Sequence, residues 1–111
     1  ANGWSILADS VLYIVHGAAG RDGRWREAVE MALTGAAFAV PTRVWLGPEA
    51  VAALARRDDG DALLDELTGF GVGCVADRAH RPAGAPAAIQ WLDDDALNAL
   101  REQSAQIIVL S

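Results

Sequence analysis

The 111-residue sequence contains one cysteine and no lysine. A single thiol cannot form an internal disulfide, so any role of Cys74 beyond packing must be chemical. All nine basic residues are arginine, which together with the many alanines indicates codon bias in a GC-rich genome rather than a function. One cysteine is compatible with a reducing compartment, and we expect a cytoplasmic protein.

The sequence also lacks an excess of basic residues and has no long apolar runs. Its net charge is −6, which argues against a broad phosphate-binding face, so we expect no direct nucleic-acid partner. No apolar run approaches the roughly 20 residues that cross a bilayer. The segment 4–8 is short and has no basic leader, so we expect neither a secretory signal nor a membrane partner.

Short apolar segments alternate with stretches of helical periodicity, which is the pattern of a parallel sheet with crossover helices. This pattern predicts strands at 11–15, 43–47, 70–76, 88–92 and 106–110, and helices at 24–38, 48–55, 61–69 and about 93–104. The length fits one domain over 1–111, with 1–9 as an amino-terminal extension. We predict an α/β fold, a three-layer α/β/α sandwich with a mainly parallel five-stranded sheet.

Cys74 lies in the apolar segment 70–76, with Arg78, His80 and Arg81 just beyond it. A lone cysteine on an apolar strand is more often a small buried hydrophobe than a nucleophile. Against this, ligands of α/β proteins bind at the carboxyl ends of parallel strands, and nearby basic groups favour the thiolate. Burial raises a thiol pKa while arginines lower it, so both interpretations remain open.

A glycine-rich loop, 16–23, follows the first predicted strand. It could hold a phosphate, but it matches neither the dinucleotide fingerprint nor a Walker loop, and we predict no cofactor. His16 suits a structural role as well as a catalytic one. Loops after the first and third strands should meet at one sheet edge, which would bring His16 and Arg21 toward Cys74. The run 93–95 of aspartates predicts a helix start rather than a metal site.

Two segments resemble the DsrE/DsrF/DsrH sulfur-relay family. The loop from His16 to Gly23 is similar to the His-Gly-x-x-x-Gly-Arg-Glu-Gly segment of the DsrF/TusC branch, with Asp22 in place of the glutamate. Cys74-Val75-Ala76, with Arg81 seven residues after the cysteine, is similar to the Cys-x-Ala segment of DsrE/TusD and TusC proteins. The resemblance spans nearly the whole chain from about Ser10 onward.

The resemblance implies a DsrE-like fold and a role in sulfur transfer, in tRNA thiolation or sulfur oxidation. Cys74 would accept sulfane sulfur as a persulfide and pass it to other sulfur-carrier proteins, as a sulfurtransferase or sulfur carrier. Arg78, His80 or Arg81 would provide positive potential beside Cys74. His16 and Arg21 would support the site from a greater distance. Such subunits assemble as homo-oligomers or with homologous chains.

The two motifs point to different roles within that family. The glycine loop matches a branch whose members serve as assembly partners, whereas Cys74 points to the carrier role. The other interpretation is therefore a non-catalytic structural subunit, or a small-ligand binding module, of a DsrE-type oligomer.

Overall fold

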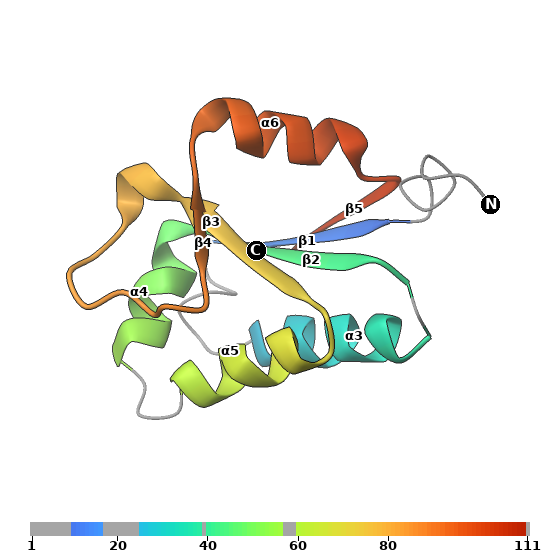
Figure 1. Cartoon of the computed structure of the whole chain (residues 1–111), viewed down its shortest axis with the longest axis horizontal. Helices are drawn as coiled ribbons and strands as arrows, with labels where there is room; N and C mark the ends of the chain where they lie inside the picture. The colour runs from blue at the N-terminus through green and yellow to red at the C-terminus, as the bar shows by residue number, and fades with distance from the viewer. Residues whose placement is uncertain (1–9, 17–24, 39, 57–59, 111) are drawn as a thin grey trace.

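The computed structural model describes residues 10–16, 25–38, 40–56 and 60–110. Its elements alternate as predicted, and five of them form one sheet (Figure 1). In chain order they are β1 (Val11–Val15), α3 (Trp25–Ala37), β2 (Thr42–Leu46), α4 (Pro48–Arg56), α5 (Gly60–Gly69), β3 (Gly73–Asp77), the 3-10 helix η1 (Arg78–His80), β4 (Gln90–Leu92), α6 (Asp94–Gln103) and β5 (Gln106–Leu110).

The five strands lie in the order β4-β3-β2-β1-β5, and every pair is parallel. From β1 to β4 the chain steps one way across the sheet, and from β4 it returns through α6 to β5 at the opposite edge. Crossovers between parallel strands are right-handed, so a reversal of direction moves the connecting helix to the other face. Accordingly α3, α4 and α5 cover one face and α6 the other, which confirms the predicted three-layer α/β/α sandwich (Figure 1).

The larger core fills the space between the sheet and α3, α4 and α5. Strand residues alternate between faces, so Val44 and Leu46 of β2 enter this core together with Cys74 and Ala76 of β3. Leu64 and the other inward-facing leucines of the helices close it from below.

A smaller core lies on the other face under α6. Its buried residues are Leu12, Val75, Leu97 and Leu100, with Ile14, Trp45 and Leu92 packed around them. Of the described elements, α6 alone covers this face of the sheet, and its core is smaller than the opposite one.

The predicted elements are confirmed, with shifts at their boundaries. Most important is β3, which the sequence placed at 70–76 and which begins only at Gly73. Gly71 has φ of 83°, and the N–H of Val72 donates to the carbonyl of Leu67 at 2.9 Å. A left-handed glycine followed by such a bond is a helix C-terminal cap, so residues 70–72 terminate α5 instead of starting the strand.

Two smaller differences have similar causes. Asp61, expected to cap a helix, lies in the first turn of α5, which begins at Gly60. The fourth strand is shorter than predicted and covers only Gln90–Leu92. Within the described ranges, the helices are too short or too polar to span a lipid bilayer.

Candidate functional site

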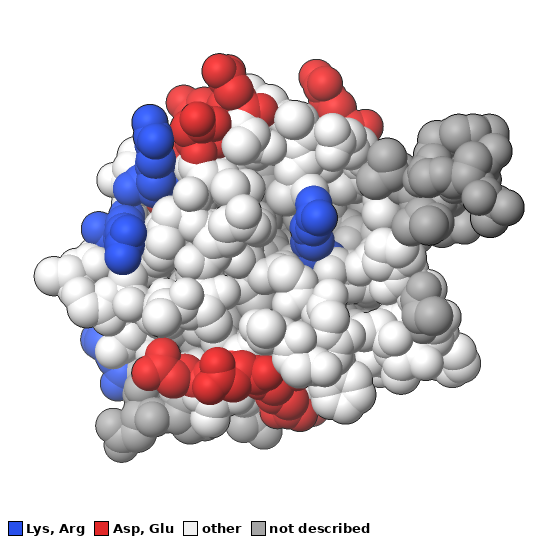
Figure 2. Space-filling model, viewed as in Figure 1, with Lys and Arg blue, Asp and Glu red and all other residues white. Residues whose placement is uncertain are grey.

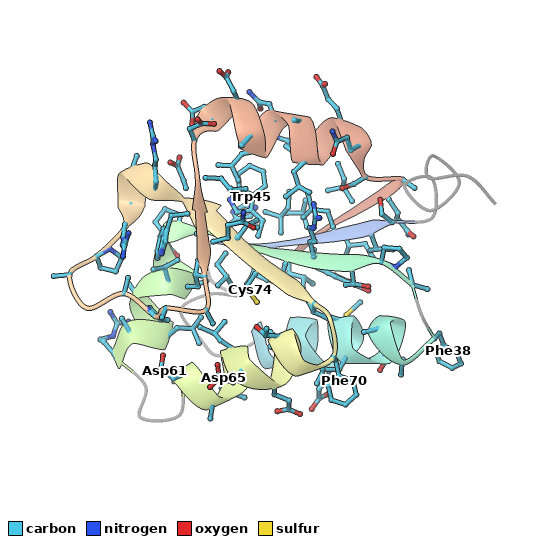
Figure 3. The ribbon with its side chains drawn as sticks, in the orientation of Figure 1. Phe38, Trp45, Asp61, Asp65, Phe70 and Cys74 are labelled. Atoms are coloured by element: carbon cyan, nitrogen blue, oxygen red, sulfur yellow. The ribbon has the colours of Figure 1, made fainter. Side chains whose placement is uncertain are left out.

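The thiol of Cys74 lies in the larger core. Its side chain is 3% exposed and faces α3 and α5, on the opposite side of the sheet from Trp45 (Figure 3). Burial raises the pKa of the thiol to about 12. At neutral pH only about one thiol in 10⁵ is then ionised, which is the reverse of what a nucleophilic cysteine requires.

β3 also ends one residue later than predicted, so Cys74 lies further inside the strand and not at the carboxyl edge of the sheet. Cys74 is the second residue of a strand that ends at Asp77. Three residues of strand separate the two positions by about 10 Å. The basic residues that follow β3 therefore lie beyond the end of the strand, and Cys74 lies inside it.

The other predicted site residues occupy that carboxyl edge where the structure describes them. His16 follows β1 directly, and Arg78, His80 and Arg81 form or follow η1. All four side chains are exposed. Arg21 lies outside the described residues. The sheet thus gathers the predicted histidines and arginines along one edge, as the topology led us to expect, but without the cysteine.

A cavity of about 130 Å³ opens at this edge between the first turn of α4 and η1. It is lined by Trp45, Leu46, Pro48, Val51, Ala76, Asp77 and His80. The apolar members come from β2, β3 and α4. Of the two titratable members, Asp77 is the N-cap of η1 and His80 is its last residue. We call this the carboxyl-edge pocket.

Local hydrogen bonds fix the polar wall of the pocket. The side chain of Asp77 caps η1 by accepting a hydrogen bond from the N–H of Ala79 at 2.9 Å. The N–H of Arg81 donates to the carbonyl of Arg78 at 3.3 Å and closes the turn. These bonds hold His80 on the pocket side of a tight turn.

A close approach of two loops forms the neighbouring part of the edge. The N–H of Gly47 donates to the carbonyl of Val15 at 2.7 Å. A Cβ at Gly47 would lie 2.8 Å from the Cβ of His16, closer than real contacts, and 3.0 Å from the Val15 carbonyl oxygen, which is tighter than most. Glycine is therefore needed where β2 turns into α4, and His16 packs against this turn.

Two arginines lie over tryptophan rings. The guanidinium carbon of Arg81 is 5.7 Å from the ring centroid of Trp91, and that of Arg101 is 5.9 Å from the centroid of Trp45. These distances suit cation–π contacts. Arg81, expected beside Cys74, instead covers Trp91 near the end of the short edge strand β4.

The aspartate run acts as the sequence predicted. The side chain of Asp93 accepts a hydrogen bond from the N–H of Ala96 at 2.8 Å and forms the N-cap of α6, while Asp94 and Asp95 lie in the first turn. In the described ranges no three histidine, cysteine or acidic side chains are grouped as metal ligands would be.

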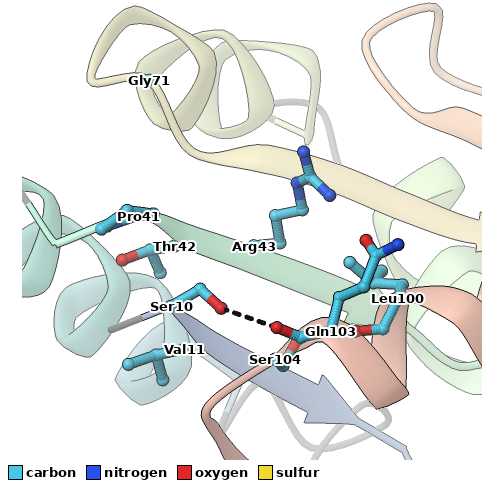
Figure 4. A pocket seen from close by; sticks show the side chains of 9 residues that line it. All are labelled: Ser10, Val11, Pro41, Thr42, Arg43, Gly71, Leu100, Gln103 and Ser104. Carbon is cyan, nitrogen blue, oxygen red and sulfur yellow. Dashed lines mark hydrogen bonds between the residues drawn. The ribbon is translucent and has the colours of Figure 1, made fainter. Parts of the chain in front are cut away.

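A second cavity, of about 170 Å³, lies at the opposite, amino edge (Figure 4). It is lined by Ser10, Val11, Pro41, Thr42, Arg43, Gly71, Leu100, Gln103 and Ser104. Its hydroxyl groups are engaged with the backbone: the Ser104 Oγ donates to the Leu100 carbonyl at 2.7 Å, and the Ser10 Oγ to the Gln103 carbonyl at 3.4 Å. Arg43 adds positive charge near the carbonyl end of α6, where a cation is stabilising. The polar groups of this cavity thus serve to end α6.

Sequence reasoning did not find Trp45, Asp77 or Pro48 as pocket residues. The signal was present, because Asp77 immediately precedes the basic segment and Pro48 marks a helix start after a strand. What the sequence could not supply was the side-by-side placement of β2 and β3.

Comparison with known proteins supports the architecture. No family model matches the sequence, and no curated protein matches it significantly. Solved structures do match in shape. The YchN protein from E. coli has a TM-score of 0.65 at 12% identity, over 92% of this chain and 98% of that one. The fold is DsrE-like.

A conserved protein of unknown function from Bacteroides thetaiotaomicron, BT1422, matches with a TM-score of 0.64 at 12% identity. The match covers 92% of this chain and 95% of that one. At such identity the likeness extends to the fold alone, so any argument about function must come from the residues of this chain.

Proposed function

We propose that this chain is a non-catalytic, small-ligand binding subunit of DsrE-like fold, with its ligand at the carboxyl-edge pocket. One observation carries the proposal: the open pocket and the titratable side chains Asp77 and His80 lie together at the carboxyl edge, while Cys74 lies in the core. Ligands of parallel α/β sheets bind at that edge.

The volume and charge of the pocket favour a small molecule with an acidic group. About 130 Å³ holds only a few water-sized groups, since a water occupies about 30 Å³ in the liquid. The side chain of Asp77 already accepts the hydrogen bond from Ala79. His80 lines the pocket as a hydrogen-bonding side chain, and the exposed cation Arg78 follows Asp77 directly in a chain of net charge −6. Figure 2 shows basic side chains at the end of the molecule that holds η1 and another basic patch nearer the middle of this face, with acidic side chains along α5 and α6.

The test is a titration followed by amide NMR with inorganic phosphate, sulfate and acetate as probes. We expect shifts centred on Ala76, Asp77 and His80. His80→Ala should weaken the response several-fold, whereas Arg43→Ala, a cation lost at the opposite edge, should leave it unchanged. Shifts centred on the amino edge, or a response that His80→Ala does not alter, would contradict the proposal.

The second candidate is sulfur transfer through Cys74, favoured by the resemblance of the segment 74–76, with Arg81, to the Cys-x-Ala segment of sulfur-relay proteins. The thiolate would attack the outer sulfur of a donor persulfide, forming a new S–S bond while the donor's S–S bond breaks. The donor would leave as its thiolate, and no net oxidation would occur. Because Cys74 is buried, this step requires β3 to open toward the basic residues at the carboxyl edge.

Intact-mass spectrometry separates the two candidates. The reduced protein is incubated with a small persulfide donor beside Cys74→Ser, in buffer and in urea. The binding-subunit proposal predicts a sulfur adduct only when urea exposes the thiol. An adduct that forms in native buffer, and is absent from Cys74→Ser, would support the sulfur carrier instead.

Assembly belongs to this proposal as well. Three apolar side chains of this region are exposed: Phe38 (78%) and Phe70 (56%) directly follow α3 and α5, and Met31 (41%) lies in the middle of α3. Figure 3 shows Phe38 and Phe70 at the same end of the molecule. Such surface supports contacts with further copies or with homologous chains.

A further inference from the structure

The edge strand β5 offers unpaired backbone groups to a partner. Among the described residues no strand pairs with its outer side. The N–H of Gln106 donates to the Ser10 carbonyl, and the Leu110 carbonyl accepts from the N–H of His16. In a parallel ladder successive residues alternate in direction, so the even-numbered residues face β1. The N–H and C=O groups of Ile107 and Val109 therefore point away from the sheet.

This edge lacks the features that usually protect edge strands. The segment 103–111 contains no charged residue and no proline, and five consecutive residues of β5 pair with β1 without a bulge. Natural edges are shortened, bulged or charged to prevent pairing. The opposite edge follows that rule, because β4 has only three residues and three aspartates follow it.

The side chains of β5 add an exposed apolar surface beside these backbone groups. Ile108 and Leu110 pack against the larger core, whereas Ile107 and Val109 lie on the α6 face and are 39% and 52% exposed. The strand therefore combines free hydrogen-bonding groups at its edge with an apolar surface beside them. That combination recognises another β-strand.

We propose that β5 pairs antiparallel with β5 of a second copy of this chain, around a twofold axis at Ile108. In that register Ile107 opposes Val109 of the second copy, and both residues have outward backbone groups. Each opposed pair then exchanges both of its hydrogen bonds, and the two sheets join into one. The strand is thus complementary to itself.

The charge of the facing segments supports a second copy as the partner, and the small contact area sets the affinity of the dimer. Two chains of net charge −6 repel each other, but here neutral segments meet, so no like charges are brought into contact. Stable interfaces bury about 1,200–2,000 Å², more than one strand pair supplies. We therefore expect a weak dimer, with a dissociation constant on the order of 10–100 μM. This inference rests on the subunit role proposed above.

The first test is sedimentation equilibrium over a range of protein concentrations. Val109→Pro removes an outward N–H but no bond to β1, and Ile107→Lys places a charge on the edge. Both should weaken dimerisation at least tenfold, whereas Ala55→Lys, which adds the same charge at an exposed position of α4, should not. Circular dichroism establishes that each variant is folded. A wild-type chain that stays monomeric up to millimolar concentration would overturn the inference.

The second test fixes the register. Opposed residues of a hydrogen-bonded pair have Cα atoms about 5.5 Å apart, within reach of a disulfide. Oxidising a mixture of the Ile107→Cys and Val109→Cys proteins should give a covalent heterodimer, while Ile107→Cys alone should not cross-link. Equal cross-linking of Ile107→Cys alone would exclude this register. Because Val109→Pro leaves the carboxyl-edge pocket intact, phosphate binding by that variant shows whether the ligand proposal survives a failed dimer.

Discussion

The thiol of Cys74 packs among apolar side chains of the sheet and the helices beneath it, and this burial couples its protonation to folding. Its pKa rises from 9.0 to about 12 because the folded environment disfavours the thiolate. Below pH 9 the thiol is protonated in both states. Above pH 9 the unfolded chain loses the proton while the folded chain keeps it, so the free energy of unfolding falls until the pH passes about 12.

This coupling predicts that Cys74 lowers alkaline stability. Between pH 8 and pH 10 the wild-type chain should lose about 1.4 kcal/mol of unfolding free energy through this group, which Cys74→Ala should not lose. Urea unfolding of both proteins at the two pH values measures the difference. Equal losses in both would mean that the folded thiol ionises normally and is therefore accessible.

The position of Cys74 also shows the limit of sequence reasoning for single residues. The apolar character of 70–76 correctly predicted a strand and a cysteine on it. The pattern could not show that Gly71 adopts φ of 83° and assigns Phe70 and Val72 to the end of α5. That backbone conformation moves the start of the strand by three residues, and the strand continues to Asp77, three residues beyond the thiol.

Individual elements were predictable where capping residues mark them. Asp93 illustrates this, because an N-cap aspartate satisfies an otherwise unpaired N–H at the helix start. We predict that Asp93→Ala lowers the free energy of unfolding by about 1 kcal/mol. Asp95→Ala, in the first turn of the same helix, should cost less because its side chain is not the cap. Thermal or urea unfolding would show this order, and equal costs would mean that only the local negative charge matters.

The turn after β2 gives a second test at this scale. Gly47→Ala would place a Cβ 2.8 Å from the Cβ of His16. Since the contact is near the backbone on both sides, we expect a loss of about 1–3 kcal/mol in urea unfolding. Gly69→Ala, where a Cβ meets nothing within 4 Å, is the matched control and should be nearly neutral. Similar losses at both positions would show that the close approach at Gly47 relaxes at little cost.

Across the whole molecule the two cores differ in size. Among the described residues, four buried ones form the core between the sheet and α6, whereas fifteen form the core on the opposite side of the sheet. A layer held by fewer buried contacts opens at lower free energy. In native-state hydrogen exchange we expect the amides of α6 to exchange before those of α5, and Leu97→Ala to speed α6 while α5 changes less. Simultaneous exchange of both helices would indicate a single cooperative unit.

The global arrangement was predictable from alternation and handedness, because apolar strands separated by helices allow few parallel topologies. The strand order, with β5 returned beside β1, was not. A final apolar strand such as β5 could pair with either β4 or β1. Which of the two it joins depends on the path of α6 across the sheet. The carboxyl-edge pocket depends on the same information, since β2 and β3 must be neighbours for Trp45 and Asp77 to share it.

The return of β5 to the side of β1 has a consequence for synthesis. Both the Ala105 and the Gln106 N–H groups donate to the carbonyl of Ser10, so the first strand made is completed by the last. Until β5 has been made, one side of β1 has no native strand to pair with. The nascent chain therefore presents an open side of an inner strand until residue 110 has emerged from the ribosome.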